Sequence, residues 1–167
     1  LNSSSKNVRS KTAASEDYFS SNTTVSNELK ADFDSYIGNQ VQEVFPNWDN
    51  VASAGNPGQL QENGGGSTRY INGKGLEYNQ AFAKGLIGAL ITDQILNNYL
   101  SLSVLDAGHN IVNNDNDVLD EGKDYTTMEH KWDESFGYLY GAEVDPQNNE
   151  PVLGVDDFLF YTDLKIT

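Results

Sequence analysis

The chain has 167 residues, of which 10 are Lys or Arg and 25 are Asp or Glu, so its formal net charge is −15. This length allows one domain with a real core, and the charge excludes attraction to nucleic acid or to an anionic membrane surface. Cysteine is absent, which excludes disulfides and thiolate metal sites. A chain of this charge is expected to bind cations. The alternative is that its acidic residues only make the protein soluble.

The N-terminal third is predicted to hold one long helix. Residues 1–21 are rich in Ser, Asn, Lys and Thr, with only a short helix expected at 14–19. In residues 26–45, apolar side chains recur at steps of three and four, which predicts an amphipathic helix. Pro46 follows directly and disfavours helical geometry in the residue before it, so the helix should end at Phe45.

A long loop and a second helix are expected next. Residues 47–75 are rich in glycine and predict a loop, in which residues 67–71 have strand character and Asn72-Gly73 is a favoured hairpin turn. A small β-hairpin is therefore expected there. The apolar stripe of residues 76–102 is too wide for a surface helix, so this segment should be a buried central helix. No membrane span is expected, because charged and amide side chains interrupt the most apolar run, residues 81–105.

The acidic stretch at residues 106–124 contains a pattern of calcium ligands. Asn113, Asp115, Asp117 and Asp124 match positions one, three, five and twelve of a calcium-binding loop, which needs oxygen ligands at this spacing. Val118 stands where such a loop has glycine. The alternative is an ordinary acidic turn.

A further helix is predicted at residues 126–140. Thr126 and Glu129 form a capping box, which marks the start of a helix. The apolar stripe of this helix, with Met128, Trp132 and Phe136, is expected in the core. After residue 141 the chain is expected to be a loop, and residues 152–167 are compatible with either a helix or a strand.

The same helix carries candidate metal ligands. His130, Asp133 and Glu134 share a face at helical spacing, so one imidazole and two carboxylates could hold a divalent ion. Glu77 from a facing helix is a further candidate, because helical bundles complete metal sites in this way. The alternative is that His130 and Asp133 pair with each other, or that the carboxylates bond to helix ends and loop amides.

Several blocks of sequence carry a resemblance to a known family: Ser10-Lys11-Thr12, Gly75-Leu76-Glu77-Tyr78, Lys84-Gly85-Leu86-Ile87-Gly88-Ala89-Leu90, Leu96-Asn97-Asn98-Tyr99-Leu100, Met128-Glu129-His130, Trp132-Asp133-Glu134 and Phe136-Gly137-Tyr138. In order and spacing they resemble the domain of unknown function 4856 family over residues 11–141. This family comprises bacterial envelope lipoproteins grouped with the imelysins. Imelysins are known for a Gly-x-His-x-x-Glu motif, whereas Met128 and Asp133 occupy the glycine and glutamate positions around His130.

The resemblance implies an all-α fold of the imelysin-like helical-bundle type. It implies that residues 1–167 form a single helical domain and that this domain is the middle part of a larger imelysin-like protein. It also implies a periplasmic or cell-surface protein anchored by a lipidated cysteine outside this chain, and a link to iron or other metal acquisition. We therefore expect a non-enzymatic cell-envelope protein that binds a metal ion (iron, zinc or calcium) or a metal-bearing ligand.

Two alternatives stay open beside this expectation. One is an imelysin-type metallopeptidase, although the sequence has no His-Glu-x-x-His motif and its two histidines lie 21 residues apart. The other is a helical protein that docks an envelope partner and holds no ligand.

Overall fold

The computed structural model describes residues 5–140 of the chain. Its contacts divide the chain into two compact units. Unit 1 comprises Leu1–Ser26 and Ile87–Thr167, and unit 2 comprises Asn27–Leu86. The predictions for residues 141–167 lie outside the described residues.

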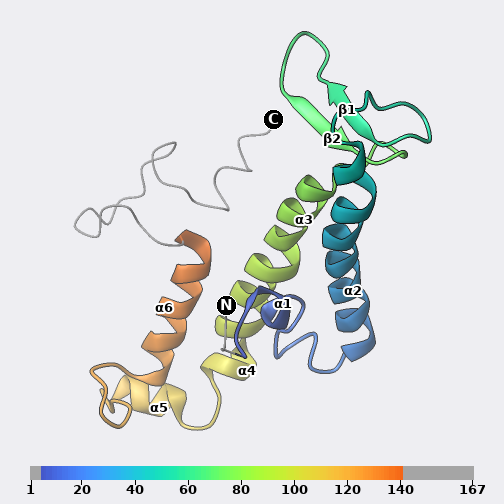
Figure 1. The fold of residues 1–167 in the computed structure, drawn as a ribbon. Coiled ribbons are helices and arrows are strands. Elements are labelled where there is room, and N and C mark those ends of the chain that lie inside the picture. The colour runs from blue at the N-terminus through green and yellow to red at the C-terminus, as the bar shows by residue number, and fades with distance from the viewer. Residues whose placement is uncertain (1–4, 141–167) are drawn as a thin grey trace. The chain divides into compact units, whose positions relative to one another are not determined.

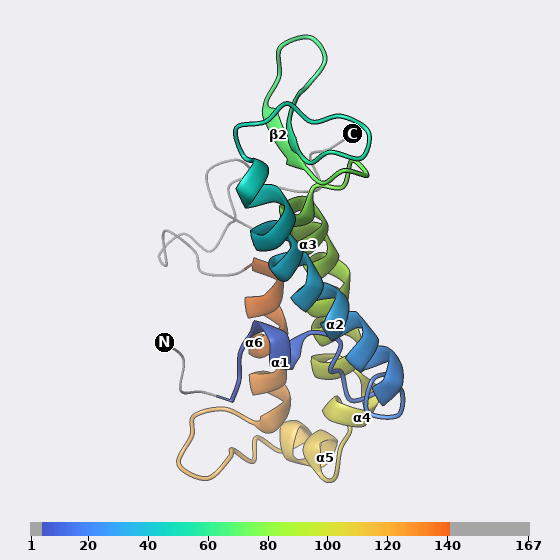
Figure 2. The same cartoon turned by 45° about the vertical axis from the view of Figure 1, so that its right-hand side comes forward.

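Unit 2 is built on two helices that lie side by side (Figures 1 and 2). The first is α2 (Thr23–Asn39), which continues through a π-helical turn η1 (Gln40–Val44) and a 3₁₀ turn η2 (Phe45–Asn47). This confirms the helix predicted at residues 26–45, but helical structure goes on past Pro46. The proline stands in the first turn of η2, where a missing N–H costs little.

The second helix of unit 2, α3 (Tyr78–Leu86), contacts α2 through aromatic side chains. Phe33 of α2 is buried and meets Phe82 edge to face, with ring centroids 5.6 Å apart. A Cβ atom at Gly85 would lie 3.0 Å from the Phe33 ring, so glycine is what allows this approach.

A small antiparallel sheet also belongs to unit 2. Strand β1 (Gly58–Gln61) pairs with β2 (Thr68–Ile71), with Gly58 opposite Ile71 and Gln61 opposite Thr68. The expected all-α class is therefore wrong: the described residues are mostly helical with one two-stranded sheet. The strand predicted at residues 67–71 is confirmed, but its partner precedes it in the chain.

Asn72 explains why the expected turn at Asn72-Gly73 is not the hairpin turn. Its buried side chain donates to the Tyr78 hydroxyl at 2.9 Å and accepts from the backbone N–H groups of Lys74 and Leu76. The Tyr78 hydroxyl in turn donates to Glu43 at 2.9 Å. Asn72 thus fixes the loop that leads into α3.

Unit 1 contains the remaining helices. The helix predicted at residues 76–102 is confirmed from Tyr78 to Tyr99, but after α3 it continues largely as two π-helical segments, η3 (Ile87–Thr92) and η4 (Ile95–Tyr99). The short N-terminal helix is α1 (Val8–Lys11) rather than the segment predicted at residues 14–19. The other helices of unit 1 are α4 (Leu102–Leu105), α5 (Asn110–Asp115) and α6 (Thr127–Tyr140).

Helix α6 confirms the prediction at residues 126–140, but it buries a different face from the one expected. The capping box is formed, since Glu129 accepts from the Thr126 backbone N–H at 2.7 Å and Thr126 Oγ1 accepts from the Glu129 N–H at 3.3 Å. Trp132 and Phe136, expected in the core, are 58% and 51% exposed, whereas Ser135 is buried. Helix α6 packs on η4 and on α5.

Within residues 5–140, no helix combines the length and the apolar character needed to cross a membrane.

The interior of unit 1 is held by polar side chains between η3 and η4. The buried Asp93 carboxylate accepts from the backbone N–H groups of Ala14 and Ser15, each at 3.2 Å. The fully buried Gln94 donates to the Lys11 carbonyl at 3.1 Å. These bonds tie the N-terminal segment to the π-helical segments and thereby set the position of Lys11.

Candidate functional site

Two π-helical segments in succession mark the region of unit 1 where a site is expected. Such segments account for well under 1% of residues in globular proteins and occur frequently at functional sites. They flank Asp93 and Gln94, and η4 ends at the buried ring of Tyr99.

Tyr99 lies at the centre of a cleft in unit 1. Two cavities of about 470 Å³ and 480 Å³ are both lined by Lys6, Lys11, Tyr99 and Glu134. Their volumes fall within the range of small-molecule sites. We call the two cavities together the Lys–Tyr cleft, and define it by these residues with Glu16, Lys131 and Tyr138.

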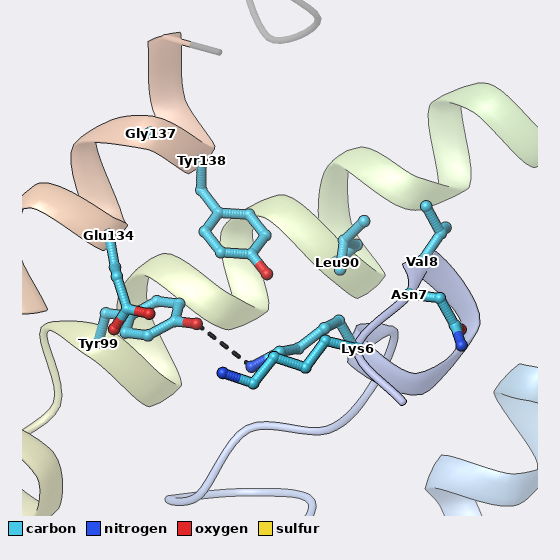
Figure 3. Close-up of a pocket in the computed structure, with 9 residues that line it drawn as sticks. Lys6, Asn7, Val8, Leu90, Tyr99, Glu134, Gly137 and Tyr138 are labelled. Atoms are coloured by element: carbon cyan, nitrogen blue, oxygen red, sulfur yellow. Dashed lines mark hydrogen bonds between the residues drawn. The ribbon is translucent and has the colours of Figure 1, made fainter. Parts of the chain in front are cut away.

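The cleft gathers cationic side chains from two segments of the chain, the N-terminal segment and α6. The Lys11 ammonium donates to the Tyr99 hydroxyl at 3.2 Å (Figure 3) and lies 5.5 Å from the centroid of its ring. The Lys131 ammonium lies at the same distance from this ring and pairs with Glu134 at 2.8 Å. Lys6 extends into the same space (Figure 3).

The charge of the cleft is opposite to that of the whole chain. Three of the ten basic residues line it, against the two carboxylates of Glu16 and Glu134. Lys131 is already paired with Glu134, whereas the Lys11 ammonium meets a phenol. The cleft is therefore a local positive region on a chain of net charge −15.

The two tyrosines of the cleft keep their protons at neutral pH. Burial raises the pKa of Tyr138 to about 12, and the neighbouring Tyr99 adds to the rise. Burial also raises the pKa of Tyr99, as does the charge of Glu134, while a hydrogen bond with Tyr138 acts in the opposite direction. Because the Tyr99 oxygen accepts from Lys11, its own proton can be donated to an acceptor in the cleft.

The candidate metal ligands of α6 are only partly brought together. His130 Nε2 lies 3.9 Å from Glu134 Oε1, and the imidazole stacks on the Tyr125 ring with centroids 4.8 Å apart. Glu134 also pairs with Lys131. Asp133 lines a separate pocket from Glu134. Glu77 belongs to unit 2, where its Oε2 lies 3.8 Å from Arg69 Nη1.

The candidate calcium ligands lie in different structural elements and do not form one loop. Asn113 and Asp115 lie within α5, and Asp117 has a positive φ of 53° just after it. Asp124 lines the same pocket as Asp133. Within residues 5–140, no three His, Asp or Glu side chains lie close enough together to hold one metal ion.

Of the residues that define the Lys–Tyr cleft, only Glu134 was named as a candidate site residue from the sequence. Lys11 and Tyr99 are 88 residues apart, so no local spacing connects them. The available signal was the resemblance itself, because Lys11, Tyr99, Glu134 and Tyr138 all lie in the blocks that carry it.

Fold and cleft together define a mostly helical protein with a cleft of small-molecule size that is lined in part by lysine and tyrosine side chains. Residues 1–162 match the family model described as Domain of unknown function (DUF4856), so the chain belongs to this family. No curated protein and no solved structure matches the chain. The family prediction is confirmed, whereas the link to the imelysins stays a prediction.

Proposed function

We propose that this protein is a non-enzymatic binding protein that holds a small, carboxylate-bearing anion in the Lys–Tyr cleft. The observation that carries the proposal is the convergence of three lysines and two protonated tyrosines on the two cavities of the Lys–Tyr cleft, which share Lys6, Lys11 and Tyr99. Ammonium groups are donors without acceptor capacity, and their hydrogen bonds to carboxylates are among the stronger ones in proteins.

Binding of an anion is supported by the state of the tyrosines. Tyr138 holds its proton across the physiological range, because its pKa is raised to about 12. A phenol in this state carries no negative charge and can donate a hydrogen bond, so it does not repel an anionic ligand. The Lys11 ammonium, which contacts the Tyr99 hydroxyl, brings an additional charge to the same ligand.

The proposal includes the metal-bearing ligands that the sequence led us to expect. A carboxylate chelate of iron presents oxygen atoms on its outside, and lysine and tyrosine donors bind such atoms directly. In this form the ligand brings the metal with it, and the protein binds the chelate through its anionic groups. The cell envelope as the place of action is part of the same proposal.

Calorimetric titration with citrate, alone and as its ferric complex, tests the proposal. We expect saturable binding that weakens as salt is added, and Lys11→Met should weaken it about tenfold, since one charge-assisted hydrogen bond is lost. Lys74→Met, which removes an exposed lysine of unit 2, is the matched control and should leave the affinity for citrate unchanged. Absence of citrate binding, or equal affinities of the two variants, would refute the proposal.

A metal ion bound directly by α6 is the second candidate. It is favoured by the approach of His130 Nε2 to within 3.9 Å of Glu134 Oε1, because a nitrogen and an oxygen one helical turn apart can share a divalent ion. Zinc titration of the protein and of His130→Ala tests it, together with elemental analysis of the purified protein. Equal zinc uptake by both would remove His130 as a ligand.

A further inference from the structure

A second pocket in unit 1 is lined by side chains of a different chemistry. It has a volume of about 430 Å³, and its lining includes Asp124, Tyr125, Met128, Glu129, Trp132 and Asp133. We call it the aromatic pocket. It shares no lining residue with the Lys–Tyr cleft.

Two aromatic side chains, Tyr125 and Trp132, line this pocket. Tyr125 is held in place by His130, whose imidazole is stacked on it with an interplanar angle of 12°. Trp132 is 58% exposed, so its indole is open to solvent within the pocket. The face of an aromatic ring carries a negative potential and attracts cations, most strongly for Trp.

Carboxylates give the pocket the same preference. Asp124 and Asp133 line it together with Glu129, which is fixed because its carboxylate accepts from the Thr126 backbone N–H. A cation in the pocket would therefore meet ring faces and negative charges at once. Met128 adds a polarisable thioether to the lining, which suits the alkyl groups of an organic cation better than a hydrated metal ion.

The chain itself places a cation beside one of these rings. The Lys123 ammonium lies 6.0 Å from the centroid of the Tyr125 ring, within the distance at which cations are attracted to aromatic faces. The loop between α5 and α6 (Figure 1) contains Lys123. The Lys123 side chain is exposed. An external cation bound at the Tyr125 ring would compete with Lys123 for the same ring.

We propose that the aromatic pocket binds a small organic cation of the alkylammonium class, held by Trp132 and Tyr125 and by the carboxylates of Asp124 and Asp133. The proposal does not rest on the Lys–Tyr cleft, whose ligand is an anion. It assigns Lys123 a definite role, since this residue weakens binding by competing for the Tyr125 ring.

Choline is the probe, and the neutral isostere dimethylbutanol is its control. The chain has two tryptophans, so Trp48→Phe leaves Trp132 as the sole tryptophan, whose emission can be excited selectively. We expect choline to change the Trp132 emission in a saturable, salt-sensitive manner and dimethylbutanol to have no such effect. Equal responses to the two compounds, or no response to choline, would overturn the proposal, and neither result depends on a pocket variant that folds.

Three variants in this background then test the assignment of residues. Asp133→Asn should weaken choline binding about threefold to tenfold, since one charge beside the cation is lost. Lys123→Ala should tighten it, which a purely structural role for Lys123 would not produce. Asp115→Asn removes an exposed carboxylate that does not line the pocket, and it is the matched control. Weaker binding by Lys123→Ala, or equal effects of the two aspartate variants, would contradict the proposed geometry.

Discussion

Asp93 is predicted to be the main anchor of the N-terminal segment that carries Lys11. Its buried carboxylate accepts three hydrogen bonds, from the backbone N–H groups of Ala14 and Ser15 at 3.2 Å and from Asn97 Nδ2 at 3.1 Å. Each bond to a charged acceptor contributes about 1.5–3 kcal/mol, and a buried N–H left without a partner costs about 1–3 kcal/mol. Because the three distances are at the long end of the normal range, the lower values apply.

Asp93→Ala should therefore lower the free energy of unfolding by about 3–5 kcal/mol. Asp93→Asn is the matched control, because the oxygen of the new amide can still accept from both backbone N–H groups. The NH₂ group of the new amide faces Asn97, whose own amide can turn so that its oxygen accepts. This variant should cost only about 1 kcal/mol. The difference between the two variants isolates the hydrogen bonds from the charge.

Urea unfolding followed by far-ultraviolet circular dichroism measures both variants. Hydrogen exchange adds a local readout, since the amides of Ala14 and Ser15 should lose protection in Asp93→Ala and keep it in Asp93→Asn. If the two variants were equally stable, or if these two amides exchanged equally fast in both, the carboxylate would not be the anchor.

Three further predictions follow from individual contacts. Burial raises the pKa of Tyr138 in the folded state to about 12, so the unfolded chain loses this proton at lower pH than the folded chain does. The free energy of unfolding should therefore fall by about 1–2 kcal/mol between pH 10 and pH 12, after allowance for solvent screening. Urea denaturation across this pH range should show a smaller fall for Tyr138→Phe. Gly85→Ala should lower the free energy of unfolding by about 1–3 kcal/mol, because the new Cβ meets the Phe33 ring. A Cβ at Gly88 meets nothing within 4 Å, so Gly88→Ala should raise the free energy of unfolding by up to about 1 kcal/mol. Equal melting temperatures of the two variants would contradict this contrast. Thr126→Ala removes the cap of α6 and should cost about 1 kcal/mol in urea unfolding, while an unchanged midpoint would mean that the capping box contributes nothing.

The sequence predicted the three long helical segments because their signals are local, but it misplaced α1 and did not predict α4 and α5. The apolar periodicity of residues 26–45 and 76–102 belongs to each segment alone, as do the Thr126 and Glu129 side chains that cap α6. The sheet was harder to predict. Gly58–Gln61 has no run of β-branched or aromatic residues, and it becomes a strand only through its pairing with Thr68–Ile71.

The exposed face of α6 shows the limit of a periodicity argument. An apolar stripe through Trp132 and Phe136 predicts a buried face, but which face is covered depends on the neighbouring elements. In the structure, η4 and α5 pack on α6, and Ser135 is buried. Both aromatic rings remain more than half exposed, and Trp132 thereby lines the aromatic pocket.

The sequence by itself determined the family, the main helices and the carboxylates and histidine that α6 carries. Only the tertiary structure decided which of these side chains meet. It separated Asp133 from Glu134 and brought Lys11 to within 3.2 Å of Tyr99 across 88 residues. The physical reason is that helix formation depends on neighbours along the chain, whereas a binding cleft depends on how buried polar groups such as Asp93 and Gln94 find partners in distant segments.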